Sequence, residues 1–279
     1  MKKRNFSVDR LTADEFPRYT SRELEDIFAV TDNMEIHKDV DKASGLKYVT
    51  VNNFFKDPDA VISFLKQLPS EDRTKSLVED KFTYMSSNAP GFQQPMESKL
   101  VARLSADIYQ IGRKTGLHKY DREQCTMEYY SNMCYPGMVS VNNNYLPHLD
   151  PFSIACNMYL TDCSRDTGTS FFQFRATDGS LHYSSTDLAR HPTAHAEYVK
   201  KYDKGRSQFS VNYRDGGISD WRIYEGDSED EPLPRFERYL YIKAHKNMCS
   251  MYRGNKWHGI TYDQVNDTEV RYSLVGVIK

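Results

Sequence analysis

Short segments of alternating or continuous apolar residues dominate the chain after about residue 120, and this pattern restricts the fold more than any other feature of the sequence. Side chains alternate between two faces along a strand, so segments of this kind predict strands rather than helices. The candidate strands are residues 124–131, 138–142, 153–160, 169–175, 181–184, 208–213, 221–224, 238–244, 247–252, 257–261 and 270–278. Many short strands with few helices between them are typical of a β-sandwich or barrel. We therefore expect a mainly β fold.

The clearest helices are expected before this region, with little helix after it. Residues 46–55 predict a strand, and Asp57-Pro58 then predicts the start of a helix, because Asp caps a first turn and Pro is tolerated at the first helical position. Residues 97–116 show the clearest helical period, and Gly116 is a suitable end. We expect the helices to pack on the outside of a sheet.

The chain divides into an N-terminal extension and one domain. Residues 1–45 are polar and mixed, and they predict an extension with one or two short helices. Residues 46–279 predict a single domain with flanking helices. The polar stretch at about 176–237, which contains an acidic run at 227–231, predicts a long insertion between core strands that acts as a lid or rim.

Composition excludes several classes of protein. The chain has 279 residues, 39% of them hydrophobic and 27% charged, which excludes a disordered chain. The net charge of -2 argues against nucleic-acid and membrane-surface partners. Five cysteines include no C-x-x-C pair, no apolar signal core follows the basic start, and no apolar run approaches the roughly 18 residues of a membrane span. We therefore expect a cytoplasmic protein with free thiols.

His148 and Asp150 stand two positions apart near the middle of the chain. On a strand they would share one face, where an imidazole nitrogen and a carboxylate oxygen can hold one divalent ion. His258 is the best candidate for a third ligand. Two histidines and one carboxylate form the facial triad of non-haem Fe(II) oxygenases, although the same ligands could hold Zn²⁺ with water.

Arg271 and Ser273 favour the oxygenase over the zinc site. Arg271 follows His258 across the polar turn at 263–267, so a returning strand would bring it back beside His258. Ser273 shares the face of Arg271, and a guanidinium with a hydroxyl makes a good receptor for a carboxylate. An oxygenase with a dicarboxylic cosubstrate needs such a receptor, whereas a zinc hydrolase does not.

The order His148-x-Asp150, His258 and Arg271-x-Ser273 resembles the 2-oxoglutarate/Fe(II)-dependent dioxygenases, and the local sequence is most similar to the prolyl-4-hydroxylase-like branch. The supporting segments are residues 51–58, 155–162, 168–172, 251–258 and 271–276. The resemblance covers roughly residues 45–279. It implies a double-stranded β-helix core, the jelly-roll or cupin-like fold, with Fe(II) at its mouth and N-terminal helices packed outside.

The resemblance also implies a role for each site residue. His148, Asp150 and His258 would bind Fe(II), Arg271 would pair with the distal carboxylate of 2-oxoglutarate, and Ser273 would assist. Tyr159 matches a position whose phenol helps to hold that carboxylate. The implied cofactors are Fe(II), 2-oxoglutarate and O₂, with ascorbate as reductant. Halogenating relatives lack the carboxylate ligand, so Asp150 favours hydroxylation, and the implied substrate is an amino acid, a peptidyl side chain or a small metabolite.

Two other functions are compatible with the same residues. One is a non-catalytic metal-binding β-barrel interaction module, and the other is a zinc hydrolase. The segment 176–237 departs from the compact family pattern, which leaves the substrate open. Within it, His182, His191 and His195 form a loose group that we interpret as structural or exposed, because their spacing demands no metal.

Overall fold

The computed structural model describes residues 20–67, 94–96, 102–119, 127–134, 147, 149, 153–162, 168–201, 233–261 and 271–278. The helices in this part are α1 (Ser21–Ile27), α2 (Pro58–Gln67), α4 (Ala102–Thr115), α5 (Ser185–Leu188) and α6 (Pro192–Lys201). The strands are β1 (Glu35–Val40), β2 (Lys47–Asn52), β3 (Gln94–Met96), β4 (Met127–Cys134), β5 (Ile154–Tyr159), β6 (Gly168–Arg175), β7 (Leu181–His182), β8 (Arg235–Lys243), β9 (Met248–Tyr252), β10 (His258–Thr261) and β11 (Arg271–Ile278). The strands predominate, which confirms the prediction of a mainly β fold.

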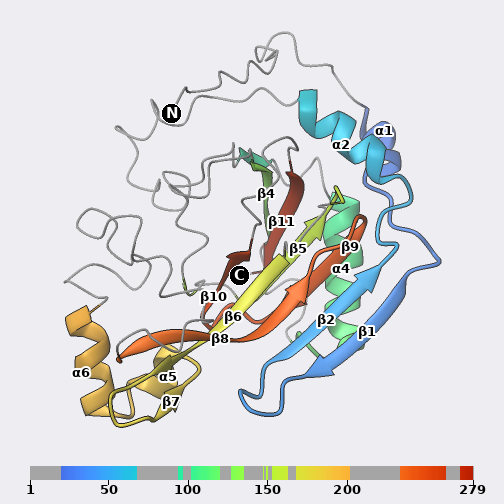
Figure 1. Ribbon diagram of the computed structural model, residues 1–279. Coiled ribbons are helices and arrows are strands. Elements are labelled where there is room, and N and C mark those ends of the chain that lie inside the picture. Colours follow the sequence, from blue (N-terminus) through green and yellow to red (C-terminus); the bar gives the residue numbers. More distant parts are fainter. Residues whose placement is uncertain are drawn as a thin grey trace, which may run out of the picture.

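The larger sheet has seven strands, drawn from both halves of the described chain. Its order is β1-β2-β9-β5-β11-β4-β3, and every neighbouring pair is antiparallel. β2 and β9 are neighbours although they are far apart in the sequence (Figure 1). The last strand, β11, lies inside the sheet between β5 and β4.

The smaller sheet is built around β6. β8 pairs with the whole length of β6, while β10 and β7 pair with its two ends along the other edge. The register shifts between Phe171 and Phe172, which leaves Tyr239 as an additional residue on β8. A bulge of this kind bends the strand and increases its twist.

The two sheets face each other through side chains of β5, β6 and β9. The phenolic oxygen of Tyr159 lies 2.7 Å from Thr169 Oγ1, and the rings of Phe171 and Tyr252 pack edge to face with centroids 4.8 Å apart. The shared core between the sheets consists of Leu46, Ala155, Tyr159, Phe171, Ile242, Ala244, Met248 and Tyr252. The described part is therefore a two-layer arrangement of antiparallel sheets.

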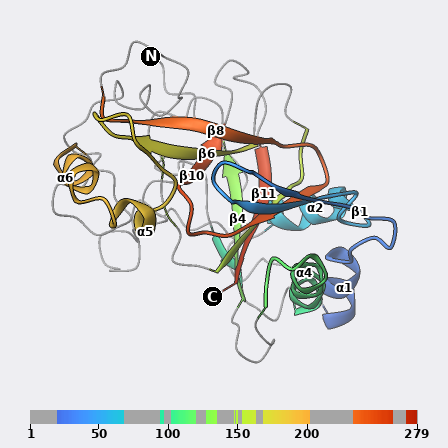
Figure 2. The ribbon, with the colours of Figure 1, turned by 90° about the horizontal axis from the view of Figure 1, so that it is seen from below.

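The outer face of the larger sheet is covered by α1, α2 and α4. The β5 residues that alternate with Ala155 and Tyr159 are buried on this side, and they are Ile154, Cys156 and Met158. The helical segments contribute Leu24, Phe28, Val61, Phe64, Leu65, Leu104, Ile108 and Ile111. In Figure 2, α1 and α4 lie on the side of the larger sheet away from β6 and β8. The predicted packing of the helices outside the sheet is confirmed.

Local sequence accounts for the ends of α2 and α4. Asp57 Oδ1 accepts hydrogen bonds from the backbone N–H groups of Asp59 and Ala60, at 3.1 and 3.0 Å. Gly116 follows α4 with φ of +71°, a left-handed conformation that glycine adopts without a steric penalty. Both ends agree with the prediction, although residues 97–101 of the expected second helix lie outside the described residues.

The segment before residue 46 contains a strand as well as a helix. Thr20 caps α1 in a capping box with Glu23, and α1 agrees with the expectation of a short helix in this segment. β1 then pairs with β2 at the edge of the larger sheet. All six β1 residues are exposed, so the apolar alternation that reveals a half-buried strand is absent.

The described part of the stretch 176–237 contains β7, α5 and α6, which lie at one end of the smaller sheet (Figure 1). A separate cluster holds this end together, and it consists of Leu149, Phe172, Phe174, Ala176, Leu188, Ala194, Phe236 and Trp257. β8 begins at Arg235, slightly before the expected end of the stretch. The strand candidates 138–142, 208–213 and 221–224 lie outside the described residues.

Candidate functional site

Two of the three predicted metal ligands, His148 and Asp150, lie outside the described residues. Leu149, between them, is buried and belongs to the same cluster as Trp257. Trp257 immediately precedes His258, the third predicted ligand. The structure therefore brings the chain at Leu149 into the same packed cluster as the chain that leads into His258.

His258 is the first residue of β10, and its side chain is buried at 3% exposure. Its Nδ1 lies 2.8 Å from the backbone carbonyl oxygen of Lys256. A carbonyl oxygen only accepts, so Nδ1 carries the proton and the neutral ring has its lone pair on Nε2. The ring packs against Tyr252 with centroids 5.0 Å apart and against Phe171 at 6.1 Å. Its orientation and tautomer are thus set by the surrounding chain.

The turn that leads into His258 is attached to neighbouring elements on both sides. Lys256 Nζ donates to the backbone oxygen of Ser44 at 2.8 Å. Burial lowers the pKa of Lys256, although Asp187 and Asp41 act in the opposite direction. On the other side, Trp257 is 1% exposed and packs on Phe236 with ring centroids 5.2 Å apart.

A network of buried polar groups lies between the sheets near His258. Tyr159 bonds to Thr169, and Asn157 Nδ2 donates both to Thr169 Oγ1 at 3.1 Å and to the Tyr252 phenol at 2.9 Å. Asn157 and Tyr159 share one face of β5, as the alternation in the sequence predicted. Tyr252, which contacts the His258 ring, is therefore linked to the predicted cosubstrate residue Tyr159.

β11 carries Arg271 and Ser273 two positions apart, on one face of the strand. Ser273 lies directly opposite Tyr159 in the antiparallel register of β11 and β5, and it is buried. Arg271 begins the strand opposite Cys134 of β4, and its side chain lies outside the described part. The backbone thus brings the three predicted 2-oxoglutarate residues to one end and one face of neighbouring strands.

A charged cluster on β6 and β8 was not found from the sequence. Glu237 accepts hydrogen bonds from Arg175 Nε at 2.8 Å, from Arg235 Nε at 2.8 Å and from Gln173 Nε2 at 3.3 Å. Burial alone would raise the Glu237 pKa, but these hydrogen bonds outweigh it and the pKa is lowered. Gln173 and Arg175 lie two and four positions after Phe171 on β6 and share its face, so the cluster faces the same way as the shared core.

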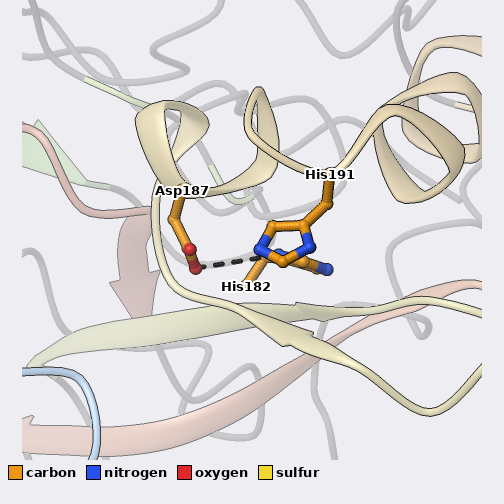
Figure 3. A group of neighbouring side chains, drawn as sticks. All are labelled: His182, Asp187 and His191. Atoms are coloured by element: carbon orange, nitrogen blue, oxygen red, sulfur yellow. Dashed lines mark ion pairs between the residues drawn. The ribbon is translucent and has the colours of Figure 1, made fainter.

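The structure also assembles a group of side chains that could hold a metal ion, and two of its members belong to the histidine group that we interpreted from the sequence as structural or exposed. His182 on β7, Asp187 on α5 and His191 before α6 turn towards one another (Figure 3), with their ligand atoms all within 4.8 Å. His195, expected in the same loose group, lies exposed on α6 and is not part of it. One feature of the sequence could have indicated this group. Asp187 and His191 are four residues apart, which is about one helical turn.

Cys156 and Cys249 are free and buried, and burial raises the pKa of both thiols. Of the helices that the structure describes, none is long and apolar enough to cross a membrane.

Comparison with known proteins gives distant structural likenesses only. Neither a protein-family model nor a curated protein matches the sequence. The chain is similar to the crystal structure of IDO from Bacillus thuringiensis, with 9% identity and a TM-score of 0.36 over 100% of this chain and 98% of that chain. An N-substituted L-amino acid dioxygenase from Burkholderia ambifaria AMMD, in complex with alpha-KG, matches 83% of this chain and 81% of its own, with 11% identity and a TM-score of 0.28. A second structure of that dioxygenase has 12% identity at the same TM-score and coverage. TM-scores this low do not establish a common fold.

Proposed function

We propose that this protein is a non-haem oxygenase that uses Fe(II), 2-oxoglutarate and O₂ to hydroxylate a C–H bond, with His148, Asp150 and His258 as the iron ligands. The substrate that the sequence favours is an amino acid, a peptidyl side chain or a small metabolite. The observation that carries the proposal is the buried, oriented imidazole of His258, which packs on Tyr252, because the Tyr252 phenol is linked through Asn157 and Thr169 to Tyr159.

The hydrogen bonding of His258 suits a metal ligand. Metal-bound histidines generally donate the second ring N–H to a carbonyl or carboxylate, which fixes the tautomer and orients the other nitrogen. The bond from Nδ1 to the Lys256 carbonyl is of this type, and it directs the lone pair through Nε2. A packed structural histidine needs no such tautomer, so this bond favours the metal-binding role.

The path of the chain supports a double-stranded β-helix. After β5 the chain crosses to β6 in the smaller sheet, returns from β8 to β9, and crosses again to β10 and back to β11. Repeated crossings between two antiparallel sheets are the arrangement of a jelly roll. His258 at the start of β10 would then lie at the mouth of the barrel, with Leu149 held nearby in the Trp257 cluster.

The chain's own residues would position the cosubstrate and exclude water. Arg271 would pair with the distal carboxylate of 2-oxoglutarate, because a guanidinium binds a carboxylate through two parallel hydrogen bonds. Ser273 and Tyr159, which are opposed across β11 and β5, would supply hydroxyl donors beside it. The rings of Tyr252 and Phe171 would keep water from one side of His258.

The hydroxyl network can orient the Tyr159 proton. Asn157 donates to Thr169, and the Thr169 hydroxyl can in turn donate to the Tyr159 oxygen. In this arrangement the phenolic O–H points to a third group, which we propose is the carboxylate of 2-oxoglutarate. When bound, iron would supply the site at which O₂, the oxidant, is activated, and 2-oxoglutarate would supply two electrons through its oxidative decarboxylation, with ascorbate as the reductant that maintains Fe(II).

The test uses protein purified without oxygen and loaded with Fe(II). We expect wild-type protein to bind 2-oxoglutarate in the presence of Fe(II), which is measured by calorimetry and by the visible absorption of the Fe(II)–2-oxo acid complex. His258→Gln should lose this binding, whereas His37→Gln, on the exposed strand β1, should retain it. Arg271→Gln should bind iron normally but 2-oxoglutarate at least about tenfold more weakly.

Turnover is then measured as succinate formed in a screen of free amino acids, short peptides and small metabolites. Succinate that depends on one of these compounds identifies the substrate class. Failure of wild-type protein to bind 2-oxoglutarate with Fe(II), or unchanged binding in His258→Gln, would overturn the proposal. Metal analysis showing zinc at His258 in freshly isolated protein would favour the hydrolase instead.

A further inference from the structure

We propose that His182, Asp187 and His191 form a second divalent metal site, suited to Zn²⁺, which joins β7, α5 and the start of α6. These residues differ from the proposed iron ligands, and the inference does not depend on the oxygenase reaction. Figure 3 shows the two imidazole rings and the carboxylate directed towards one shared space. Each residue offers one ligand atom, and these atoms all lie within 4.8 Å of one another.

The buried nitrogen of His182 is the observation that points to a ligand. His182 is 1% exposed, and within the described part its Nδ1 has no hydrogen-bond partner. The nearest carboxylate oxygen, Oδ2 of Asp187, is 3.7 Å away, which is too far for a hydrogen bond. A buried polar atom left without a partner is unfavourable by about 1–3 kcal/mol. A metal ion between Nδ1 and the carboxylate would satisfy it.

The other nitrogen of His182 is already engaged in the way that a metal ligand requires. Its Nε2 lies 3.0 Å from Ser180 Oγ. If Nε2 donates to this hydroxyl, the lone pair of the neutral ring is on Nδ1, the nitrogen that faces Asp187 and His191. Burial lowers the pKa of His182 and so favours the neutral ring, although Asp187 and Asp178 oppose this shift.

Asp187 is held in place by the short helix that carries it. Ser184 caps α5 by accepting a hydrogen bond from the Asp187 N–H at 3.1 Å. The Asp187 carboxylate also accepts a bond from the Tyr183 N–H, at 3.1 Å. The next residue, Leu188, is buried in the cluster with Trp257 and anchors the helix. The carboxylate is therefore fixed before any ion binds.

His191, in the connection between α5 and α6, is the third member of the group. Its N–H bonds to the Leu188 carbonyl at 3.0 Å, and its own carbonyl accepts the first hydrogen bond of α6 from His195 at 2.9 Å. Its ring lies close to that of His182, with centroids 4.6 Å apart. Because the side chain of His191 is exposed, it can rotate to complete the site, and an ion can enter from its side.

The chemistry of the ligands selects the ion. Two imidazole nitrogens and one carboxylate oxygen suit zinc, with ligand bonds of about 2.1 Å and water as the fourth ligand. Calcium and magnesium prefer oxygen ligands and would bind poorly here. A tetrahedral ion of this size places its ligand atoms about 3.4 Å apart, so only a small rotation of His191 is needed. The bound ion would stabilise the end of the smaller sheet where β7, α5 and α6 meet.

The experiment uses His258→Gln as the background, so that zinc bound at the proposed iron site does not contribute. We expect one zinc per chain after equilibrium dialysis of this variant against Zn²⁺, together with a higher melting temperature. Adding His191→Ala should remove one ligand and weaken zinc binding by about 100-fold, with loss of the thermal shift. His191 is exposed, so this variant should fold normally in the absence of zinc.

The matched control is His195→Ala, which removes an exposed histidine four residues further along and should leave zinc binding unchanged. Asp187→Asn keeps the shape of the side chain and should also weaken zinc binding. Absence of zinc binding in the His258→Gln background, or equal binding with and without His191, would overturn the proposal. Loss of zinc in both the His191→Ala and His195→Ala variants would show that the ligands are wrongly assigned. None of these outcomes depends on 2-oxoglutarate, so the two proposals stand or fall separately.

Discussion

The phenolic oxygen of Tyr159 lies 2.7 Å from Thr169 Oγ1, and this hydrogen bond joins β5 of the larger sheet to β6 of the smaller one. Tyr159 is also directly opposite Ser273 on β11. One residue therefore has two roles in our account, because it holds the sheets together and it lies at the proposed carboxylate site. The two roles make different experimental predictions.

Tyr159→Phe should destabilise the protein by about 1–2 kcal/mol, because the buried Thr169 hydroxyl loses a partner. Thr169→Val removes the same bond but keeps the phenol. If Tyr159 also binds 2-oxoglutarate, the Tyr159 variant should bind it more weakly than the Thr169 variant at equal stability. Urea unfolding and calorimetry measure the two effects.

A double-mutant cycle with Tyr159→Phe and Thr169→Val isolates the hydrogen bond between these two side chains, and we expect the double variant to lose less stability than the sum of the two single losses. Tyr48→Phe is the control, since the Tyr48 phenol bonds to the exposed Asp39 and this bond should contribute less to the free energy of unfolding. Additive losses at Tyr159 and Thr169 would contradict the structural role, and equal 2-oxoglutarate affinities in the two variants would contradict the binding role.

Side-chain alternation allowed part of this arrangement to be predicted from sequence. The common face of Asn157 and Tyr159 follows from their spacing on a strand, and the register of β5 confirms it. The bond to Thr169 could not be predicted, because it depends on how two sheets pack and not on the pattern of either strand. β1 was missed because both of its faces are exposed, which removes the apolar alternation.

The group around His182 was missed for a related reason. Its spacing matches no simple ligand motif, since Asp187 reaches His182 only through the four-residue helix α5. Proximity in the sequence groups His191 and His195 with His182. In the structure the third member of the group is the Asp187 carboxylate, and His195 lies outside it. Short helices of this kind have too few residues for a clear period, so their geometry is hard to read from sequence.

Gly168→Ala should destabilise the protein strongly, by about 1–3 kcal/mol or more. A Cβ at this position would overlap the backbone carbonyl oxygen of Ile242, which cannot move without distorting the β6–β8 pair. Gly112→Ala on α4 is the control, because its nearest neighbours are side-chain atoms, with His118 Cβ at 3.3 Å. Thermal unfolding of both variants tests the comparison, and an unchanged melting temperature in Gly168→Ala would contradict this packing.

Glu237 should make the stability of the protein sensitive to acid. Its pKa in the folded protein is lowered, so its contribution is present above the pKa of the unfolded chain, near 4.5, and is lost as pH falls through the folded value. Glu237→Gln should be less stable than wild type at neutral pH, and the two curves should converge as the pH falls below about 4.5. Glu25→Gln on the exposed face of α1 is the control. Parallel curves for wild type and Glu237→Gln would contradict the prediction.

Asn247 connects the end of β2 to the turn before β9. Two substitutions at this position separate the contribution of its backbone conformation to stability from that of its side-chain hydrogen bonds. Its φ is +61°, and its side chain accepts from the Phe55 N–H at 2.7 Å and donates to the Phe55 carbonyl at 2.9 Å. Asn247→Gly keeps the backbone conformation but loses both bonds, while Asn247→Ala also adds left-handed strain of about 1–2 kcal/mol. We therefore expect stability to fall in the order wild type, Gly, Ala, as measured by urea unfolding.

Asn53 is the matched control for Asn247, because its φ is also positive, at +53°, while its side chain is exposed. There the glycine variant should be close to wild type and the alanine variant should lose only the strain energy, because little hydrogen bonding is removed. The Asn247 backbone N–H also donates to the Tyr159 carbonyl at 2.8 Å, and Asn247→Gly keeps this bond, so 2-oxoglutarate binding should be retained in both glycine variants. Equal stabilities for Asn247→Gly and wild type would show that the two side-chain bonds to Phe55 contribute nothing to stability.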